Sequence, residues 1–530
     1  MDGKMLKTVG LLLFFMWFPS VWCEAGIVPK PLSVIERRGT FRITPHTRLY
    51  AAEGLESEAR LFMADIVPLL DHGIARSEQL RGADIVLRLD SALEAEEYLL
   101  QIAPGRMTLS GGTPCGVFYA LQSLRQLIAE HGASIPALEI HDKPDMVYRG
   151  AMLDVSRHFF PVEEVKRFID LLALHKLNRF HWHLTDDQGW RIEIRRYPRL
   201  TEIGSQRRET LVGVMREGET MRFDHIPYGG YYTQDEVREI VSYAAARHIE
   251  VIPEIDMPGH GMGALAAYPW LGCTGGPYEV WTRWGVSEDL YCAGRETTFT
   301  FIEHVLSEIL ALFPSRQIHI GGDECPVTRW QDCPQCRRRM QTERLADETA
   351  LRSYFVRRIQ QWLQARGREI IGWDELLEGE LSSEVTLMVW RDPAHAYEAI
   401  RRGCRVILSP KQYCYLDYSQ TADPVRYEPP CHDTRYVPLR QVYRLEPFDR
   451  LRPEERSQVL GVQGNVWTEY MPDMECLEFM ILPRLAALAE VGWACERKCY
   501  SDFMTRMPVL IALYEKLGYR YADYVFRGIE

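Results

Sequence analysis

The chain has 530 residues, more than one hydrophobic core usually holds. Hydrophobic residues make up 46% and charged residues 26% of it, which is ordinary for a folded protein and excludes general disorder. The net charge of -12, without a basic run, argues against binding of nucleic acid. We therefore expect one large domain and one smaller domain.

Residues 1–25 have the pattern of an export signal peptide. Lys4 and Lys7 precede an apolar stretch from Val9 to Phe18, which is too short to cross a membrane as a helix. We expect cleavage near residues 23–25 and an exported protein, either periplasmic or secreted. Cys23 could instead carry a lipid anchor, although the bulky Trp22 is a poor neighbour for that reaction. No later segment resembles a membrane span.

Residues 26–146 predict a small α+β domain with an antiparallel sheet. Short β-like runs at 83–89, 98–103 and 106–110 are separated by turn residues, and residues 116–130 have apolar positions at helical spacing. A carbohydrate-binding module would be an alternative, but no exposed row of aromatic residues supports it. We expect a scaffold domain.

From residue 147 to 505, strand-like runs alternate with amphipathic helices. The expected strands are 149–155, 178–184, 250–255, 318–321, 370–373, 385–390, 404–409 and 460–464. Eight strands spaced for β/α units predict a closed parallel (β/α)8 TIM barrel. Residues 506–530 are expected to form a helical tail packed on this barrel.

Polar and aromatic residues gather where the predicted strands end, which is the functional end of such barrels. These residues are Asp154, His183, Glu254, Asp256, Asp323, Glu324, Trp373, Trp390 and Trp467. The adjacent acids Asp323 and Glu324 follow a strand and two glycines. A solvated loop pair would be the ordinary explanation, but glycosidases also need one protonated carboxyl group beside a second charged group.

Six segments, in order, make the chain similar to family 20 glycoside hydrolases, the β-hexosaminidases and chitobiases. They are 149–159, 181–190, 253–260, 319–324, 372–375 and 467–469, within a region of resemblance from about 148 to 500. The preceding small domain also resembles the N-terminal domain of that family. The resemblance implies exo-acting removal of terminal β-linked N-acetylglucosamine or N-acetylgalactosamine from oligosaccharides or glycoconjugates.

The same resemblance implies the chemistry. Glu324 is the expected general acid and then general base, while Asp323 orients and stabilises the substrate's acetamide as its oxygen attacks the anomeric carbon. The expected intermediate is an oxazolinium ion, and two displacements retain the β configuration. Such a mechanism needs neither a cofactor nor a metal ion.

The remaining candidates surround these two acids. Arg149 is expected to bind two sugar hydroxyls through its planar guanidinium, with Glu469 and Asp417 as further hydroxyl partners. Tyr415 would hold the acetamide oxygen. The expected pocket walls are Trp373, Trp390 and Trp467.

A second layer of residues is expected behind the pocket: Asp186, Asp256, His183, His260 and His319. The histidines would tune or relay the proton of Glu324, or simply fix loop ends. His181 and His183 could suggest a metal pair, since residues two apart share a strand face, but no carboxylate–histidine metal signature accompanies them.

The cysteines leave two interpretations open. Cys273 and Cys292 flank a loop with Trp281 and Trp284, and we expect a disulfide between them. Cys333 and Cys336 have zinc-ligand spacing, but no second pair with that spacing follows, so structural thiols or disulfides are favoured. The tryptophan loop either borders the next sugar subsite or forms a pinned surface lid.

Three alternatives differ in class or reaction. A family 18 chitinase is disfavoured because its Asp-x-x-Asp-x-Asp-x-Glu run is absent from the sequence. A sugar-binding barrel without catalysis conflicts with the presence of both Asp323 and Glu324. A transglycosylase shares the intermediate and stays open. The sequence does not set the sugar configuration, the glycan source, the oligomeric state or the optimal pH.

Overall fold

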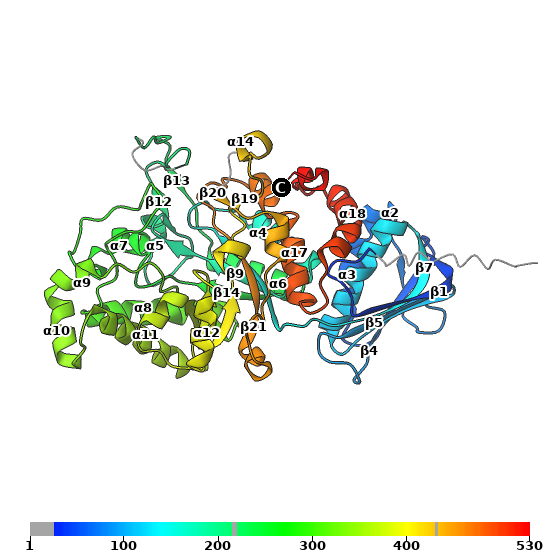
Figure 1. The fold of residues 1–530 in the computed structure, drawn as a ribbon, viewed down its shortest axis with the longest axis horizontal. Helices are drawn as coiled ribbons and strands as arrows, with labels where there is room; N and C mark the ends of the chain where they lie inside the picture. The colour runs from blue at the N-terminus through cyan, green and yellow to red at the C-terminus, as the bar shows by residue number, and fades with distance from the viewer. Residues whose placement is uncertain (1–25, 215–219, 430–432, 530) are drawn as a thin grey trace, which may run out of the picture.

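The computed structural model describes residues 26–214, 220–429 and 433–529. The predicted signal peptide, with Cys23, lies outside these residues. Figure 1 shows a smaller N-terminal domain in blue beside a large domain that runs from cyan to orange. Among the described residues, no helix combines the length and apolar composition needed to cross a membrane.

The N-terminal domain is a seven-stranded sheet in the order β1-β7-β5-β6-β4-β2-β3, packed against helix α3. Its strands are β1 (Ser33–Arg42), β2 (Arg48–Ala51), β3 (Ala75–Arg76), β4 (Ile85–Leu89), β5 (Tyr98–Ala103), β6 (Arg106–Gly111) and β7 (Ser134–Asp142). Its helices are α1 (Glu56–Asp65), α2 (Val67–Leu70) and α3 (Pro114–His131). The sheet is mixed, which corrects the antiparallel prediction, because β4 pairs in parallel with both β6 and β2.

The large domain is a closed parallel barrel, which confirms the TIM-barrel prediction. Its strands are β8 (Tyr148–Asp154), β9 (Arg179–His183), β14 (Glu250–Glu254), β15 (Gln317–His319), β16 (Glu369–Trp373), β17 (Thr386–Val389), β18 (Arg405–Leu408) and β21 (Val459–Val466). β8 is buried along its whole length, as expected where helices cover one face of a strand and the barrel interior the other.

Helices return the chain between the barrel strands. The longer ones are α4 (Val162–Leu174), α6 (Gln234–Ala245), α8 (Glu296–Leu312), α10 (Pro334–Glu343), α11 (Glu348–Gln364), α12 (Ala394–Arg401), α16 (Met474–Ile481), α17 (Arg484–Trp493) and α18 (Tyr500–Leu517). A capping box starts α6: the Thr233 hydroxyl accepts the Glu236 N–H, and the Glu236 carboxylate accepts the Thr233 N–H.

Short elements fill the connections of the large domain. The helical ones are α5 (Arg199–Glu202), α7 (Met262–Ala267), η1 (Pro269–Leu271), α9 (Thr328–Asp332), η2 (Asp374–Glu378), α13 (Lys411–Cys414), α14 (Pro424–Tyr427), α15 (Leu439–Tyr443), η3 (Pro453–Gln458) and η4 (Asp523–Arg527). The short strands are β10 (Thr185–Asp186), β11 (Gly189–Trp190), β12 (Gln206–Arg207), β13 (Tyr228–Gly229), β19 (Tyr418–Ser419) and β20 (Asp433–Tyr436).

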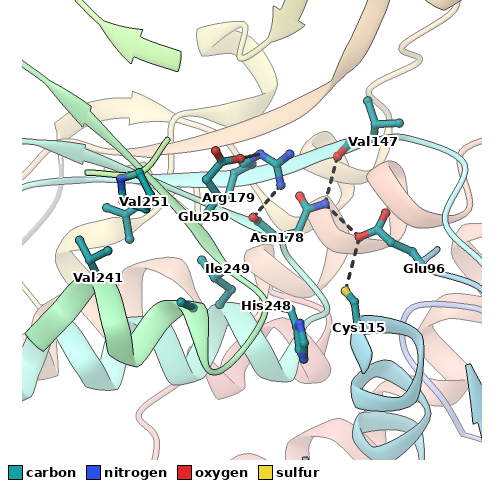
Figure 2. Close-up of a pocket in the computed structure, with 12 residues that line it drawn as sticks. Glu96, Cys115, Val147, Asn178, Arg179, Val241, His248, Ile249, Glu250 and Val251 are labelled. Atoms are coloured by element: carbon teal, nitrogen blue, oxygen red, sulfur yellow. Dashed lines mark hydrogen bonds and ion pairs between the residues drawn. The ribbon is translucent and has the colours of Figure 1, made fainter. Parts of the chain in front are cut away.

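Buried polar contacts join the two domains. Asp142, at the end of β7, accepts hydrogen bonds from the Tyr98 hydroxyl at 2.7 Å and from Trp493 Nε1 at 2.9 Å, and it pairs with Lys176 at 3.2 Å. Figure 2 shows a pocket beside this junction, in which Asn178 of the barrel donates to Glu96 of the N-terminal domain. The N-terminal domain thus contacts the barrel near the starts of β8 and β9, away from the carboxyl ends of these strands.

Helix α18, in red in Figure 1, lies between the barrel and α3. Arg506 of α18 pairs with Glu490 of α17 at 2.7 Å, and Tyr514 contacts His175 Nε2 at 2.5 Å. The same helix packs on α3 and α2 of the N-terminal domain. The C-terminal helix therefore reaches both domains and begins at Tyr500.

Candidate active site

The turn after β15 directs two neighbouring carboxyl groups into one pocket. Gly321 and Gly322 have φ of +69° and +96°, and a Cβ on Gly321 would lie 1.7 Å from Asp256 Oδ1. Only glycine fits there, because the backbone is left-handed and the neighbouring carboxylate is so close. Glu324 also has a positive φ, of +41°, which is strained for a residue with a side chain.

The pocket at the carboxyl ends of the strands brings together most of the predicted residues. It is lined by Arg157, His260, Asp323, Glu324, Trp373, Trp390, Tyr415, Asp417, Arg435, Trp467, Glu469 and Tyr470. The predicted catalytic pair, the three tryptophans, Tyr415, Asp417 and Glu469 are therefore neighbours in space, although the chain separates them by up to 146 residues, from Asp323 to Glu469.

The aromatic residues form the pocket walls. Trp390 and Tyr415 stack with ring centroids 5.9 Å apart, and Trp373 lies 6.0 Å from Trp467. Trp390 Nε1 donates to Glu375 at 3.0 Å and Trp373 Nε1 donates to Glu254 at 2.9 Å, which fixes both rings. Rigid apolar walls of this kind suit the apolar face of a sugar ring.

His260 connects Asp323 and Glu324 to the layer of polar residues behind them. Its Nε2 lies 3.7 Å from Asp323 and 3.6 Å from Glu324, while its Nδ1 contacts Asp186 at 3.0 Å. Burial alone would lower the pKa of His260, but the charges of Asp186 and Asp323 outweigh it and raise that pKa well above the usual value. The imidazole is therefore a cation beside both carboxyl groups.

The two pocket acids have opposite pKa shifts. Burial, together with the nearby Asp256 carboxylate, raises the pKa of Asp323 well above its usual value. The nearby His260 imidazole, whose Nε2 lies 3.6 Å away, lowers the pKa of Glu324, whose side chain is 41% exposed. In the open pocket Asp323 therefore holds a proton more tightly than Glu324 does. A general acid at Glu324 would need the opposite order.

Beneath the pocket, the barrel interior contains a polar cluster around Glu254. This carboxylate contacts His181 at 3.0 Å and His319 at 2.8 Å, and it hydrogen-bonds to His183 Nδ1. Burial would lower the pKa of His183, but the carboxylates of Glu254 and Asp186 raise it to about 10. His183 and His319 therefore lie behind the pocket: both contact Glu254, and His183 also contacts Asp186 at 2.9 Å.

Arg149 does not reach the pocket, which corrects its predicted role. It lies near the start of β8, is 1% exposed, and binds Glu96 at 2.8 Å and the Met146 carbonyl at 2.6 Å. The start of a barrel strand faces the stability end of the fold rather than the functional end. Arg149 thus belongs to the domain junction shown in part in Figure 2.

Arg157 occupies the place that Arg149 was expected to fill. It follows the carboxyl end of β8, pairs with Asp186 at 2.8 Å and Asp154 at 3.3 Å, and its guanidinium lies 4.9 Å from the Trp467 ring. The quoted segment 149–159 contains both arginines. Their positions relative to the strand end could have distinguished them. The lining residues Arg435, in the short strand β20, and Tyr470, next to Glu469, were not predicted.

The loop between Cys273 and Cys292 lies at the functional end but outside the pocket lining. Trp284 is buried and packs 5.8 Å from His158 and 6.4 Å from Tyr470, a lining residue. The backbone N–H of Trp281 donates to the Asp187 carbonyl at 2.9 Å. The predicted Cys273–Cys292 disulfide is wrong, since both residues are free thiols.

Two neighbouring carboxyl groups in an aromatic pocket, at the carboxyl end of a (β/α)8 barrel, are typical of a glycoside hydrolase. The model of glycosyl hydrolase family 20, catalytic domain, matches residues 146–496, and that of family 20, domain 2, matches residues 24–143. The chain belongs to glycosyl hydrolase family 20.

Individual relatives agree with this family. A β-hexosaminidase of Porphyromonas gingivalis is 41% identical over 91% of this chain, which spans 62% of that relative's length. A β-hexosaminidase of Vibrio furnissii is 35% identical, with 88% of this chain and 76% of the relative covered. The crystal structure of β-N-acetylhexosaminidase from Bacteroides fragilis superimposes with a TM-score of 0.80 at 33% identity, covering 94% and 96% of the two chains.

Proposed function

We propose that the protein is an exo-acting, retaining β-N-acetylhexosaminidase that uses the substrate's acetamide as the nucleophile. The observation that carries this proposal is the position of Asp323. Its Oδ1 is buried in the pocket and has no hydrogen-bond partner among the described residues. A carboxyl oxygen there can accept the acetamide N–H, and the adjacent Glu324 is the acid on the same turn.

The reaction then runs in two displacements. The acetamide carbonyl oxygen attacks the anomeric carbon, the bond to the leaving oxygen breaks, and Glu324 gives its proton to that oxygen. A carboxyl oxygen of Asp323 accepts the N–H of the oxazolinium ring, and His260, 3.7 Å from Asp323, holds that side chain in place. The Glu324 carboxylate next takes a proton from water, whose oxygen attacks the anomeric carbon and restores the acetamide with the β configuration retained.

Substrate binding resolves the low proton affinity of Glu324 in the open pocket. A sugar that covers this 41%-exposed side chain removes water from it, and desolvation raises the pKa of a carboxyl group. Tyr415, a pocket residue that is 6% exposed, is our candidate for holding the acetamide oxygen. Arg157, Asp417 and Glu469 are the candidates for binding the sugar hydroxyls.

Comparisons with known proteins support the substrate class. The structure of an exo β-N-acetylglucosaminidase from Vibrio harveyi in complex with N-acetylglucosamine has a TM-score of 0.84 to this chain, at 30% identity. This match covers 94% of this chain and 78% of that one. We further propose export of the protein, on the basis of its first 25 residues; cell fractionation tests this location.

The deciding experiment compares nitrophenol release from the N-acetyl-β-glucosaminide and from the plain β-glucoside. Strong hydrolysis of the first with almost none of the second is the expected result, because only the first carries the internal nucleophile. Comparable rates would require a nucleophile from the protein and would overturn the mechanism. Binding of the sugar without turnover would favour a non-catalytic binding barrel, and dominant transfer to added sugar would favour a transglycosylase.

A further inference from the structure

Four cysteine thiols meet beside the active-site loops. Cys292 Sγ lies 3.7 Å from Cys333 Sγ and 3.6 Å from Cys336 Sγ, and Cys273 Sγ lies 3.8 Å from Cys336 Sγ. All four sulfurs lie within 4.8 Å of one another. Cys292, Cys333 and Cys336 are buried, and Cys273 is partly buried.

These separations match a metal tetrahedron. Sulfurs bound to a central zinc ion at about 2.3 Å lie about 3.8 Å from one another at the corners of a tetrahedron. A disulfide instead brings two sulfurs to about 2.0 Å. The three sulfur–sulfur separations above differ by only 0.2 Å and single out no one pair, which favours one central ion that binds all four sulfurs.

The local fold brings the ligands together from two separate segments. A β-bridge between Gly272 and Tyr291 places Cys273 beside Cys292, and the Cys292 N–H donates to the Leu271 carbonyl at 2.8 Å. Cys333 caps the N-terminus of α10, and Cys336 lies in its first turn. The positive end of a helix favours the thiolate form that binds metal.

The two segments fit closely around the cluster. A Cβ on Gly294 would lie 2.2 Å from the Gln335 backbone, so the loop after Cys292 touches the first turn of α10. Trp330 Nε1 of α9 donates to the Tyr291 carbonyl at 3.0 Å. Cys273 and Cys292 therefore form the second pair of possible zinc ligands. They are adjacent in space, but because they lie 19 residues apart, the sequence spacing did not reveal them.

We propose that these four cysteines bind one structural Zn²⁺ ion, which fastens the loop after β14 to the segment after β15. The loop after β14 carries His260. Its two ends are joined where the Tyr291 N–H, next to Cys292, donates to the Pro258 carbonyl at 3.0 Å. The segment after β15 carries Asp323 and Glu324, and it continues into α9 and α10. The ion thus holds the histidine and the two acids in register without touching substrate. This proposal is independent of the proposed hydrolase activity.

The test measures metal in the full chain, purified without a metal-affinity column and under reducing conditions. Native mass spectrometry and elemental analysis are expected to find one zinc per chain, and a mercurial reagent that blocks thiols should release it. Refolding with Co²⁺ should give the absorption of a tetrahedral cobalt tetrathiolate. These measurements need no variant and therefore do not depend on whether a variant folds.

Variants locate the ion. Cys336→Ser should lose the zinc or bind it at least tenfold more weakly and lower the melting temperature, whereas Cys404→Ser, a buried cysteine outside the cluster, should keep it. Full zinc content in Cys336→Ser would overturn the site. So would four freely titrating thiols in metal-free native protein, two disulfides found by peptide mapping, or iron in place of zinc.

Discussion

Two arginines within one sequence motif, residues 149–159, show what decides function at the scale of a residue. Arg149 and Arg157 have the same side chain, and eight residues of chain separate their numbers. One lies near the start of β8 and binds Glu96, while the other follows its end and lines the pocket. The position of an arginine along the strand therefore predicts its role better than the chemistry of its guanidinium does.

Substitution of the two arginines should give opposite phenotypes. Arg157→Ala should lower kcat/KM on the aryl N-acetylglucosaminide by about 10- to 100-fold or more, because charge-assisted hydrogen bonds contribute about 1.5–3 kcal/mol. Arg149→Ala should cost about 1–3 kcal/mol of stability, because it removes a buried guanidinium with its hydrogen bonds and leaves the half-buried Glu96 carboxylate without its cation. Its KM should not change. Steady-state kinetics and denaturant unfolding measure both, and a raised KM in Arg149→Ala alone would contradict this assignment.

The two acids should differ in their sensitivity to the leaving group. Glu324→Gln should lose about 10²- to 10⁴-fold in kcat on alkyl and sugar leaving groups, the usual range for general acid–base catalysis. It should lose much less on nitrophenol, which leaves without a proton. Asp323→Asn should be impaired on both, because acetamide attack comes first. Equal, small losses from both changes would argue against these roles.

The pH profile should reflect Glu469. Burial raises the pKa of Glu469 to about 6, against the opposing charge of Arg157. This carboxylate is therefore ionised above pH 6 and becomes protonated as the pH falls through 6. If it accepts hydrogen bonds from the sugar, kcat/KM should decline below about pH 6. The Glu469→Gln variant should have a lower kcat/KM at every pH, and its kcat/KM should not decline further below pH 6. If the decline below pH 6 is unchanged in this variant, another group causes it.

Elements were more predictable than residues. The strands of the barrel follow from apolar runs between turn signals, and the predicted and observed bounds of β9 and β14 differ by a residue at most. Strand direction in the N-terminal sheet was not predictable, because a strand's own sequence does not say whether its neighbour runs parallel. The thiol cluster was missed for a similar reason: Cys273 and Cys292 become a pair only through a β-bridge.

The turn after β15 can be tested as an element. Gly321→Ala should strain the left-handed backbone by about 1–3 kcal/mol and push against Asp256. Displacement of the turn by about 1 Å should lower kcat by about 10²-fold. Gly105→Ala is the matched control, because a Cβ there meets no atom within 4 Å. Equal kinetics for the two variants would show that the turn tolerates a side chain.

At the scale of the whole molecule, the two domains share their buried charges. Lys176 of the large domain is fully buried against Asp142 of the N-terminal domain. Asp142→Ala should therefore lower the stability of both domains together, by about 3–5 kcal/mol, since it leaves the lysine unpaired. Calorimetry should show one unfolding transition at a lower temperature, with KM unchanged. Two separated transitions in the unaltered protein would contradict this coupling.

The charge pairs at the junction also constrain how such a protein can evolve. Arg149 and Lys176 come from one domain, and their partners Glu96 and Asp142 come from the other. A recombination event that joined this barrel to an unrelated domain would inherit two cations without counterions. The boundary near residue 145 is therefore a poor place for domain shuffling, and the two halves are expected to be inherited as one unit.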